Sequence, residues 1–310
     1  MSTKKRRRYT SKPKARSRKK AEEDQWLVAL VSGAVFLVFS VWWASSQKPR
    51  AAGEFKAAEH LTMEERVDHW SKRVFEVAQK KEDLRFLGSV PKVEDTAPLV
   101  PDSFDCTTYV ETVAALSVSS GTDSFFSALK GIRYKDGVVG FFTRNHFPEV
   151  DWLPNNEKAG YIVDVTEKVA DSAGADTKTE SKDINKAKWY ARKKSRFEQD
   201  GRVPASAIPE SWRGTQEGKV HYIPLDDLDK VYSKLPNGVI MNLVRKDIGG
   251  QDVIVSHQGF LIREGKRVMF RHVSLSGRPQ YIELKNYLHR RSENKDWPVL
   301  GINLNQVKGI

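Results

Sequence analysis

The sequence predicts an α+β fold in which N-terminal helices pack on an antiparallel sheet, preceded by one membrane-spanning helix. An uncharged apolar run follows a basic tail, helical periodicity dominates residues 61–132, and β-type patterning dominates from residue 223 onward. Hydrophobic residues make up 39% of the 310 residues, and 8 Trp, 14 Phe and 9 Tyr are enough to fill a substantial core. The chain is therefore long enough for one or two folded domains.

The positive charge of the chain is concentrated at its N-terminus. The formal net charge is +12, and residues 1–20 hold 11 of the 52 Lys and Arg residues and no acid. The other 41 basic residues nearly balance 40 acidic ones, so the body lacks the charge of a nucleic-acid-binding domain. We predict a basic cytoplasmic tail over residues 1–25 and expect no nucleic-acid partner, although such a tail could also contact anionic lipid or cytoplasmic nucleic acid.

Trp26–Ala44 is the predicted membrane-spanning helix. It has 19 residues and no charge, and at about 1.5 Å per residue it nearly spans a hydrocarbon core of about 30 Å. Tryptophans at both ends suit the membrane interfaces, and the preceding basic tail keeps the N-terminus cytoplasmic and exports the body. Two alternatives stay open, a cleaved signal peptide and a buried helix of a soluble core.

The exported part begins with a linker at residues 45–60, and residues 61–310 form one predicted domain. Apolar residues at helical spacing predict three helices within it. Thr62 suits the cap of the first helix, and Ser103 or Asp105 suits the cap of the second. The predicted helices cover Leu61–Lys80, Thr107–Val118 and Phe125–Ile132.

Later segments are punctuated by turn signals. A strand-turn-strand pattern surrounds Asp136-Gly137, and the turn Leu235–Gly238 precedes a short strand at Val239–Val244. A predicted hairpin follows, formed by Val253–Arg263 and Lys266–Leu275. Residues 171–201 are rich in Lys, Asp, Ser and Glu and are interpreted as a charged surface insertion, partly helical, which is either solvated or binds an acidic wall polymer or a partner.

Cys106 is the only cysteine, so an intrachain disulfide and a metal site built from several cysteines are excluded. It lies at the start of the second predicted helix, where free N–H groups and the helix dipole favour a thiolate. The backbone N–H of Cys106 could also receive an oxyanion. A helix-start cysteine can equally be a small core residue, so a base must be found elsewhere.

The predicted hairpin offers that base. With Glu264-Gly265 as a two-residue turn, Arg263 faces Lys266 and His257 lies directly opposite His272. Opposed residues share one face of a sheet, so one histidine can orient the other, as in a catalytic triad. A register slip of one residue would place the rings on opposite faces.

A second dense segment, RNHFPEVDW, runs from Arg144 to Trp152. We expect Arg144, Asn145, His146 and Trp152 to line a substrate groove, with the tryptophan stacking on a sugar or peptide. The opposing interpretation is a loop whose tryptophan packs into the core and whose histidine meets solvent.

These motifs resemble a known family. FDCTTYVETVAAL, IRY, RNHF…DW, DVT, LPNGVI and SHQGF…FRHVS occur in this order between about Val67 and Asn303. Together they resemble the N-acetylmuramoyl-L-alanine amidase-like family, which belongs to the NlpC-type, papain-like cysteine hydrolases of bacterial cell walls. The Cys-containing motif and the SHQGF–RHVS pair are the most specific of them.

The resemblance implies a papain-like fold whose helix carries Cys106 as nucleophile and whose sheet carries His257 as base and His272 as third residue. It implies peptidoglycan as substrate and no metal or cofactor. With Trp26–Ala44 as anchor, the protein would lie in the bacterial inner membrane with its catalytic domain in the periplasm. The charged insertion and the anchor are departures from the family, and they leave substrate access and physiological role open.

The expected function is hydrolysis of a peptidoglycan amide, either the muramoyl–L-Ala bond or a bond within the stem peptide. Two alternatives stay open: a non-catalytic wall-binding protein with the same fold, and a peptidyl or acyl transferase using the same residues. The sequence leaves open the scissile bond and the oligomeric state.

Overall fold

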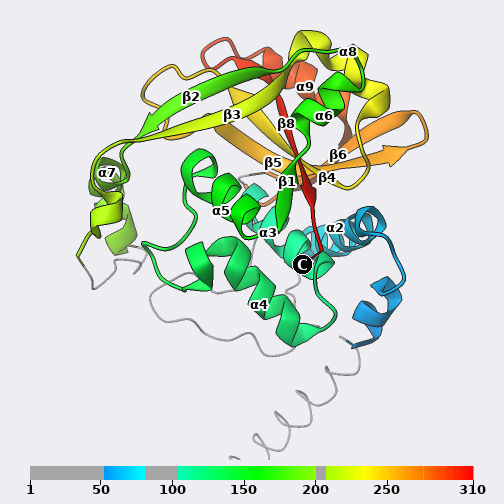
Figure 1. The fold of residues 1–310 in the computed structure, drawn as a ribbon, viewed down its shortest axis with the longest axis horizontal. Helices are drawn as coiled ribbons and strands as arrows, with labels where there is room; N and C mark the ends of the chain where they lie inside the picture. The colour runs from blue at the N-terminus through cyan, green and yellow to red at the C-terminus, as the bar shows by residue number, and fades with distance from the viewer. Residues whose placement is uncertain (1–51, 81–103, 200–206, 275, 310) are drawn as a thin grey trace, which may run out of the picture. The chain divides into compact units, whose positions relative to one another are not determined.

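A computed structural model describes residues 52–80, 104–199, 207–274 and 276–309, which form an α+β fold (Figure 1). The predicted basic tail at 1–25 and the predicted membrane-spanning segment Trp26–Ala44 lie outside the described residues. Among the helices that these ranges contain, none is both long and apolar enough to cross a membrane.

An antiparallel sheet of eight strands organises the described residues. Its order is β2-β3-β8-β4-β5-β6-β7, and β1 pairs with β8 beside β3. Every residue of the central strand β4 is buried, as expected for a strand covered on both faces. The strands are β1 Ile162–Asp164, β2 Lys178–Ile184, β3 Gln216–Pro224, β4 Val239–Arg245, β5 Val255–Glu264, β6 Arg267–Val273, β7 Pro279–Glu283 and β8 Val299–Val307.

Helices α2 (Met63–Lys80) and α3 (Cys106–Ser117) cover one face of the sheet, and α4 (Thr122–Arg133) packs on α3 (Figure 1). Their apolar side chains pack with Ile240 and Phe260 of the sheet in one core cluster. Helix α3 lies centrally and is buried almost all round, which explains its nearly continuous apolar sequence. The predicted helices at 61–80, 107–118 and 125–132 are thereby confirmed within a few residues at each end.

The other face is covered by α6 (Thr166–Asp171), α8 (Leu228–Val231) and α9 (Leu284–Ser292) (Figure 1). A second core cluster there includes Leu261 and Phe270 of the sheet and Tyr287 of α9. Residues 257 and 272 share this face, because side chains two apart along a strand point the same way. The histidine pair and the start of α3 therefore belong to different layers, and they meet where the pairing of β5 with β6 ends.

The predicted hairpin forms, but its predicted register is wrong. Glu264 pairs with Arg267, which makes Gly265-Lys266 the turn and shifts each partner by two residues. Gly265 has φ 61°. A two-residue turn in which only the first residue has a positive φ is of the II′ type, and this type prefers Gly at its first position. A shift of two keeps every side chain on its predicted face, so His257 and His272 still share a face.

The helix at residues 52–58 corrects the expected polar linker at 45–60. Phe55 is buried, and its ring centroid lies 5.2 Å from that of Trp70 in α2. An aromatic side chain that can be buried against a neighbouring helix stabilises order in a segment that composition alone marks as a connector. The described part of the linker is therefore part of the folded domain.

The charged insertion at 171–201 contains ordered elements, strand β2 and helix α7 (Lys186–Gln199). Strand β2 is the edge strand and pairs with β3, and most of its residues are exposed. Helix α7 is fixed by Tyr190 and Phe197, which pack with Phe141 and Trp212. These aromatics explain how so polar a segment is held to the domain.

The strand-turn-strand expected around Asp136-Gly137 is reduced to a 3-10 turn at Lys135–Gly137 and one isolated bridge between Tyr134 and Arg144. The turn itself is where it was expected, because Asp136 and Gly137 both have positive φ. The remaining described segments are short: Pro148–Trp152, α5 (Leu153–Lys158), Glu210–Trp212, Leu225–Asp227 and Tyr232–Lys234.

Candidate active site

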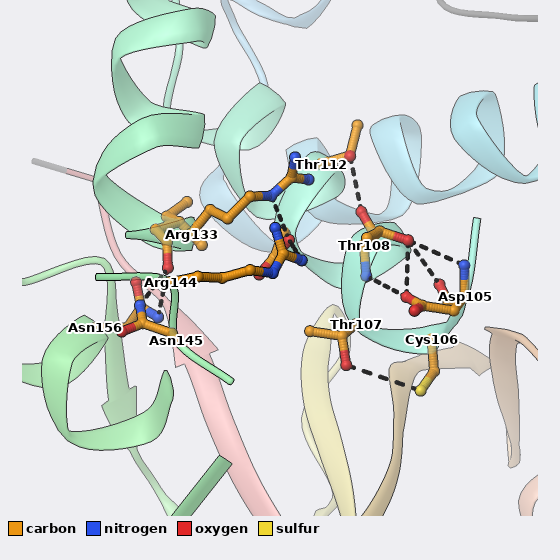
Figure 2. Close-up of polar contacts among 11 residues, drawn as sticks. Asp105, Cys106, Thr107, Thr108, Thr112, Arg133, Arg144, Asn145 and Asn156 are labelled. Atoms are coloured by element: carbon orange, nitrogen blue, oxygen red, sulfur yellow. Dashed lines mark hydrogen bonds and ion pairs between the residues drawn. The ribbon is translucent and has the colours of Figure 1, made fainter. Parts of the chain in front are cut away.

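Cys106 is the first residue of α3, as expected. Asp105 caps the helix: its Oδ1 accepts from the Thr108 N–H at 2.8 Å, and the Asp105 N–H donates to Thr108 Oγ1 at 2.9 Å. A reciprocal cap of this kind contributes about 1 kcal/mol and fixes the direction in which the helix starts. The cap, drawn in Figure 2, uses the third N–H of the helix and leaves the first two, those of Cys106 and Thr107, outside it, and the Thr107 N–H hydrogen-bonds the thiol.

The thiol itself is buried, with 7% of the Cys106 residue exposed. Its close polar side-chain neighbour is Thr107 Oγ1, at 3.9 Å from Sγ. Burial first, and then the charge of Asp105, raise the Cys106 pKa to about 11, and hydrogen bonding from the Gln258 and Thr107 backbones opposes this only in part. The expected thiolate is therefore corrected to a thiol at neutral pH, because desolvation outweighs the helix terminus.

His257 and His272 are in contact, although they are diagonal rather than directly opposed. His257 Nε2 lies 2.8 Å from His272 Nδ1, and the rings meet edge to face with centroids 4.7 Å apart. Gly259 makes this contact possible, because a Cβ there would lie 2.7 Å from the Cβ of His272 and 2.6 Å from the Phe270 ring. The side chain of His272 therefore reaches across the missing Gly259 side chain to His257.

Both histidines are held neutral. Burial lowers the pKa of His257 to about 3, with additional contributions from His272, Arg291 and Arg245. Burial and then Arg291 lower the pKa of His272 to about 4. At neutral pH the site thus contains an uncharged thiol and two uncharged imidazoles.

The structure brings the thiol to strand β5, which carries His257. The Gln258 N–H that hydrogen-bonds the sulfur belongs to the residue that follows His257. Within the described residues the thiol makes no hydrogen bond to either imidazole, and its sulfur points toward the Thr107 hydroxyl (Figure 2). A rotation about the Cα–Cβ bond of Cys106 is the simplest movement that would redirect the sulfur.

Tyr287 of α9 completes the cluster and was missed in the sequence. Its ring centroid lies 5.1 Å from that of His272 and 6.0 Å from that of His257. Burial raises its pKa to about 12, and a charge on Cys106 acts in the same direction. No motif marks Tyr287, because its position depends on how α9 docks on the sheet. Gln258 could have been found, since it lies inside the SHQGF motif.

Arg144 lies on the other side of the α3 start. Its Nη2 is 3.8 Å from Glu111 Oε2, and Glu111 also pairs with Arg133 at 2.7 Å. Figure 2 shows the two guanidinium groups side by side and directed toward α3, whereas the Cys106 sulfur points away from them. Arg144 keeps 22% of its side chain exposed and can still reach a ligand.

The three other predicted groove residues have different positions. Asn145 is buried, donates to the Ile132 carbonyl at 2.9 Å and accepts from Asn155 at 2.7 Å. His146 bonds the Phe141 carbonyl at 2.8 Å and joins the aromatic cluster on α7. Trp152 is only 1% exposed and packs in the core. Stacking of Trp152 on a ligand is therefore corrected, because its ring has no free face.

Comparisons with known proteins agree with this architecture. A protein from Legionella pneumophila has a solved structure with a TM-score of 0.64 and 23% identity, covering 85% of this chain and 94% of its own. An N-acetylmuramoyl-L-alanine amidase from Bacteroides uniformis matches with a TM-score of 0.50 and 21% identity, covering 77% and 99%. At these identities the likeness concerns the fold. A search of curated protein sequences finds no match.

The sequence comparison with protein families is more specific. The model described as N-acetylmuramoyl-L-alanine amidase-like matches residues 80–293, well over half of the chain. This range contains Cys106, His257, His272 and Tyr287. The chain belongs to the N-acetylmuramoyl-L-alanine amidase-like family.

Proposed function

We propose that the protein is a papain-like, NlpC-type cysteine hydrolase that cleaves an amide bond of peptidoglycan. The observation that carries the proposal is the cluster at the start of β5. There the Gln258 N–H hydrogen-bonds the sulfur of the helix-start Cys106, and the preceding residue, His257, is hydrogen-bonded to His272. Membership of the amidase-like family supports the substrate class. A nucleophile, a base and an orienting residue are the three parts that acyl transfer from an amide requires.

The first step follows from the neutral state of the site. Because the pKa of Cys106 is raised to about 11, the thiol needs a base during attack. His257 takes the S–H proton on Nδ1 while Sγ forms a bond to the amide carbon. The N–H groups of Cys106, Thr107 and Gln258 are the candidates to stabilise the resulting oxyanion.

The tautomers follow from the hydrogen bond between the histidines. A free Nδ1 on His257 places its proton on Nε2, which donates to His272 Nδ1 at 2.8 Å. His272 then carries its own proton on Nε2, a buried atom without a partner among the described residues. His272 thus holds the ring and tautomer of His257 and stabilises the imidazolium that forms.

The second half of the cycle returns the proton. The imidazolium of His257 protonates the leaving amine as the C–N bond breaks, which leaves a thioester on Cys106. Water then attacks the thioester carbon, His257 accepts the water proton, and the released thiolate is reprotonated. The products are an amine and a carboxylic acid, as amide hydrolysis requires.

The proposed substrate is the muramoyl–L-Ala amide or a bond within the stem peptide. Arg144 is the groove residue retained in the proposal, because it is partly exposed beside the helix that carries Cys106. We further propose that Trp26–Ala44 anchors the protein in the inner membrane with the domain in the periplasm. A fusion of alkaline phosphatase to residue 310 should be active, and an inactive fusion with full expression would contradict this topology.

Digestion of purified sacculi by the full chain tests the function. We expect soluble muropeptides from the wild type and none from Cys106→Ala or His257→Ala, with mass spectrometry identifying the bond. His289→Ala is the matched control, because His289 is exposed on α9 and lies outside the site. Equal digestion by Cys106→Ala would overturn the proposal.

A further inference from the structure

Two arginines beside the histidine pair have no carboxylate partner among the described residues. Arg245 is the last residue of β4 and is 5% exposed. Its Nε donates to Ser256 Oγ at 3.0 Å and its Nη1 to the Trp297 carbonyl, both uncharged partners. A buried guanidinium without an anion loses hydration that neutral acceptors only partly replace.

The backbone is irregular on both sides of Arg245. Leu243 pairs with His257 but Val244 pairs with Val255, so Ser256 is an extra residue in β5. The pairing of β4 with β8 shifts between Val244 and Arg245. Bulges of this kind occur next to active sites, where they redirect a side chain. Here the extra residue supplies the hydroxyl that holds Arg245, and the next residue is His257.

Arg291 approaches from the other side, on α9. It is exposed, and its guanidinium carbon lies 5.1 Å from the centroid of Tyr287, the ring that contacts both histidines. Burial, and after it the nearby charge of Arg291, lower the pKa of Arg245. Their charges also reach His257. One buried and one exposed guanidinium thus flank the proposed base.

Other arginines in the domain differ in this respect. Arg271, which also stacks on a tyrosine, pairs with Asp68 at 2.8 Å, and Arg133 pairs with Glu111 at 2.7 Å. In these two cases a carboxylate of the fold neutralises the guanidinium group. The groups beside the proposed base receive none from the described residues.

We propose that Arg245 and Arg291 form a carboxylate-binding subsite, which binds an acidic group of the substrate beside the scissile amide. A planar guanidinium matches a carboxylate through two parallel hydrogen bonds, and stem peptides carry free carboxylates. Arg245 provides the fixed part of the subsite, and Arg291 closes it from solvent. The inference rests on the proposed function, since it assigns a substrate group to the same site.

A bound carboxylate would also favour catalysis. The groups around His257 are His272 on β6, Cys106 on α3, Tyr287 and Arg291 on α9, and Arg245 on β4. Only the two arginines carry charge at neutral pH, and an anion between them opposes their effect on the His257 pKa. The substrate would thereby make His257 a stronger base when the reaction needs it.

The test compares two stem-peptide substrates that differ at one group, a free carboxylate or its carboxamide. With the full chain, we expect the wild type to prefer the acid in kcat/KM by at least about tenfold, the scale of a charge-assisted hydrogen bond. Arg291→Gln should lower kcat/KM for the acid by about 10- to 100-fold, mainly through KM, and bring the acid-to-amide ratio near one. Arg290→Gln is the matched control, because Arg290 is an exposed neighbour on the same helix.

Binding to full-length Cys106→Ala, measured by calorimetry, separates this inference from the proposed function. Tighter binding of the acid than of the amide, lost in Cys106→Ala/Arg291→Gln, supports the subsite even if the wild type cleaves neither peptide. Cleavage with equal kcat/KM for acid and amide would overturn the subsite and leave the hydrolase intact. Equal binding of both peptides to Cys106→Ala would also overturn it.

Discussion

Two polar clusters flank the start of α3, and they treat charge in opposite ways. In one, the fully buried Glu111 faces the guanidinium groups of Arg133 and Arg144. In the other, a buried thiol and two imidazoles are all held neutral, and the nearby guanidinium groups face no described carboxylate. The first arrangement is that of a structural ion pair, and the second, a cluster of buried groups with shifted pKa values, is of a kind often found at functional sites.

The contrast predicts that the two clusters fail differently. Loss of the neutral cluster should abolish catalysis and leave folding intact, whereas loss of the charged cluster should destabilise the fold.

The largest expected effect is on activity, in His257→Ala. Without a base for a thiol of raised pKa, kcat should fall by about a thousandfold or more. The measurement is release of muropeptides under saturating substrate, with thermal unfolding as a check of folding. A variant with more than a tenth of wild-type kcat would show that His257 is not the base.

The charged cluster is tested by Glu111→Ala. Removing the carboxylate breaks the buried ion pair with Arg133, which should lower the free energy of unfolding by about 3–5 kcal/mol. Urea denaturation measures the loss. Glu167→Ala, at an exposed position on α6, is the control and should change stability by about 0.5 kcal/mol or less. A similar small change in Glu111→Ala would remove the distinction between the clusters.

His272→Gln should have an intermediate effect. Glutamine can accept from His257 Nε2 but cannot reproduce the imidazole geometry, so kcat should fall by about 10- to 100-fold with little change in KM. A steady-state comparison with wild type measures the fall. An equal rise in KM with unchanged kcat would instead place His272 in substrate binding.

Acid should destabilise the fold through the neutral histidines. Their folded pKa values are lowered to about 3 and about 4, below the usual 6.5. The stability they contribute is complete above pH 6.5 and is lost as the pH falls toward these values. Between pH 7 and pH 4.5 the free energy of unfolding should therefore fall by about 1–2 kcal/mol less in His257→Gln than in wild type. Parallel pH profiles of unfolding for the two proteins would contradict the neutral state.

Glu149 should have the opposite effect on the pH dependence of stability. Burial raises its pKa to about 7, and its Oε1 accepts from the Val255 N–H at 2.6 Å at the start of β5. Its contribution to stability is complete below pH 4.5 and is lost as the pH rises through 7. The substitution Glu149→Gln should thus raise the free energy of unfolding by about 1–2 kcal/mol at pH 8 and leave it unchanged at pH 4. Calorimetric unfolding at both values measures this, and a loss at pH 8 would refute it.

The sequence predicts the positions of the residues in the neutral cluster better than those in the charged cluster. The position of Cys106 follows from local capping, and the shared face of His257 and His272 follows from strand alternation, which survived a register error of two residues. The physical reason for the register is Gly265, whose positive φ suits the first position of a type II′ turn.

Tertiary contacts decide the remainder. Two bulges place Arg245, and the docking of α9 places Tyr287 and Arg291, near the histidines. No local sequence pattern encodes either arrangement. Trp152 lies in the core because other residues pack on every side of it. Its neighbours in the sequence would fit a groove position equally well. The segment 52–58 is helical because the packing of Phe55 on Trp70 stabilises it.

A covalent intermediate on Cys106 tests the central claim most directly. Full-length wild type mixed with excess muropeptide, quenched in acid and digested with pepsin, should yield the peptide containing Cys106 with the mass of one acyl group added. The adduct should disappear on treatment with hydroxylamine, as a thioester does, and should be absent in Cys106→Ser. The account would be contradicted if wild type released product while no peptide carried the acyl group, and if Cys106→Ala released product as well.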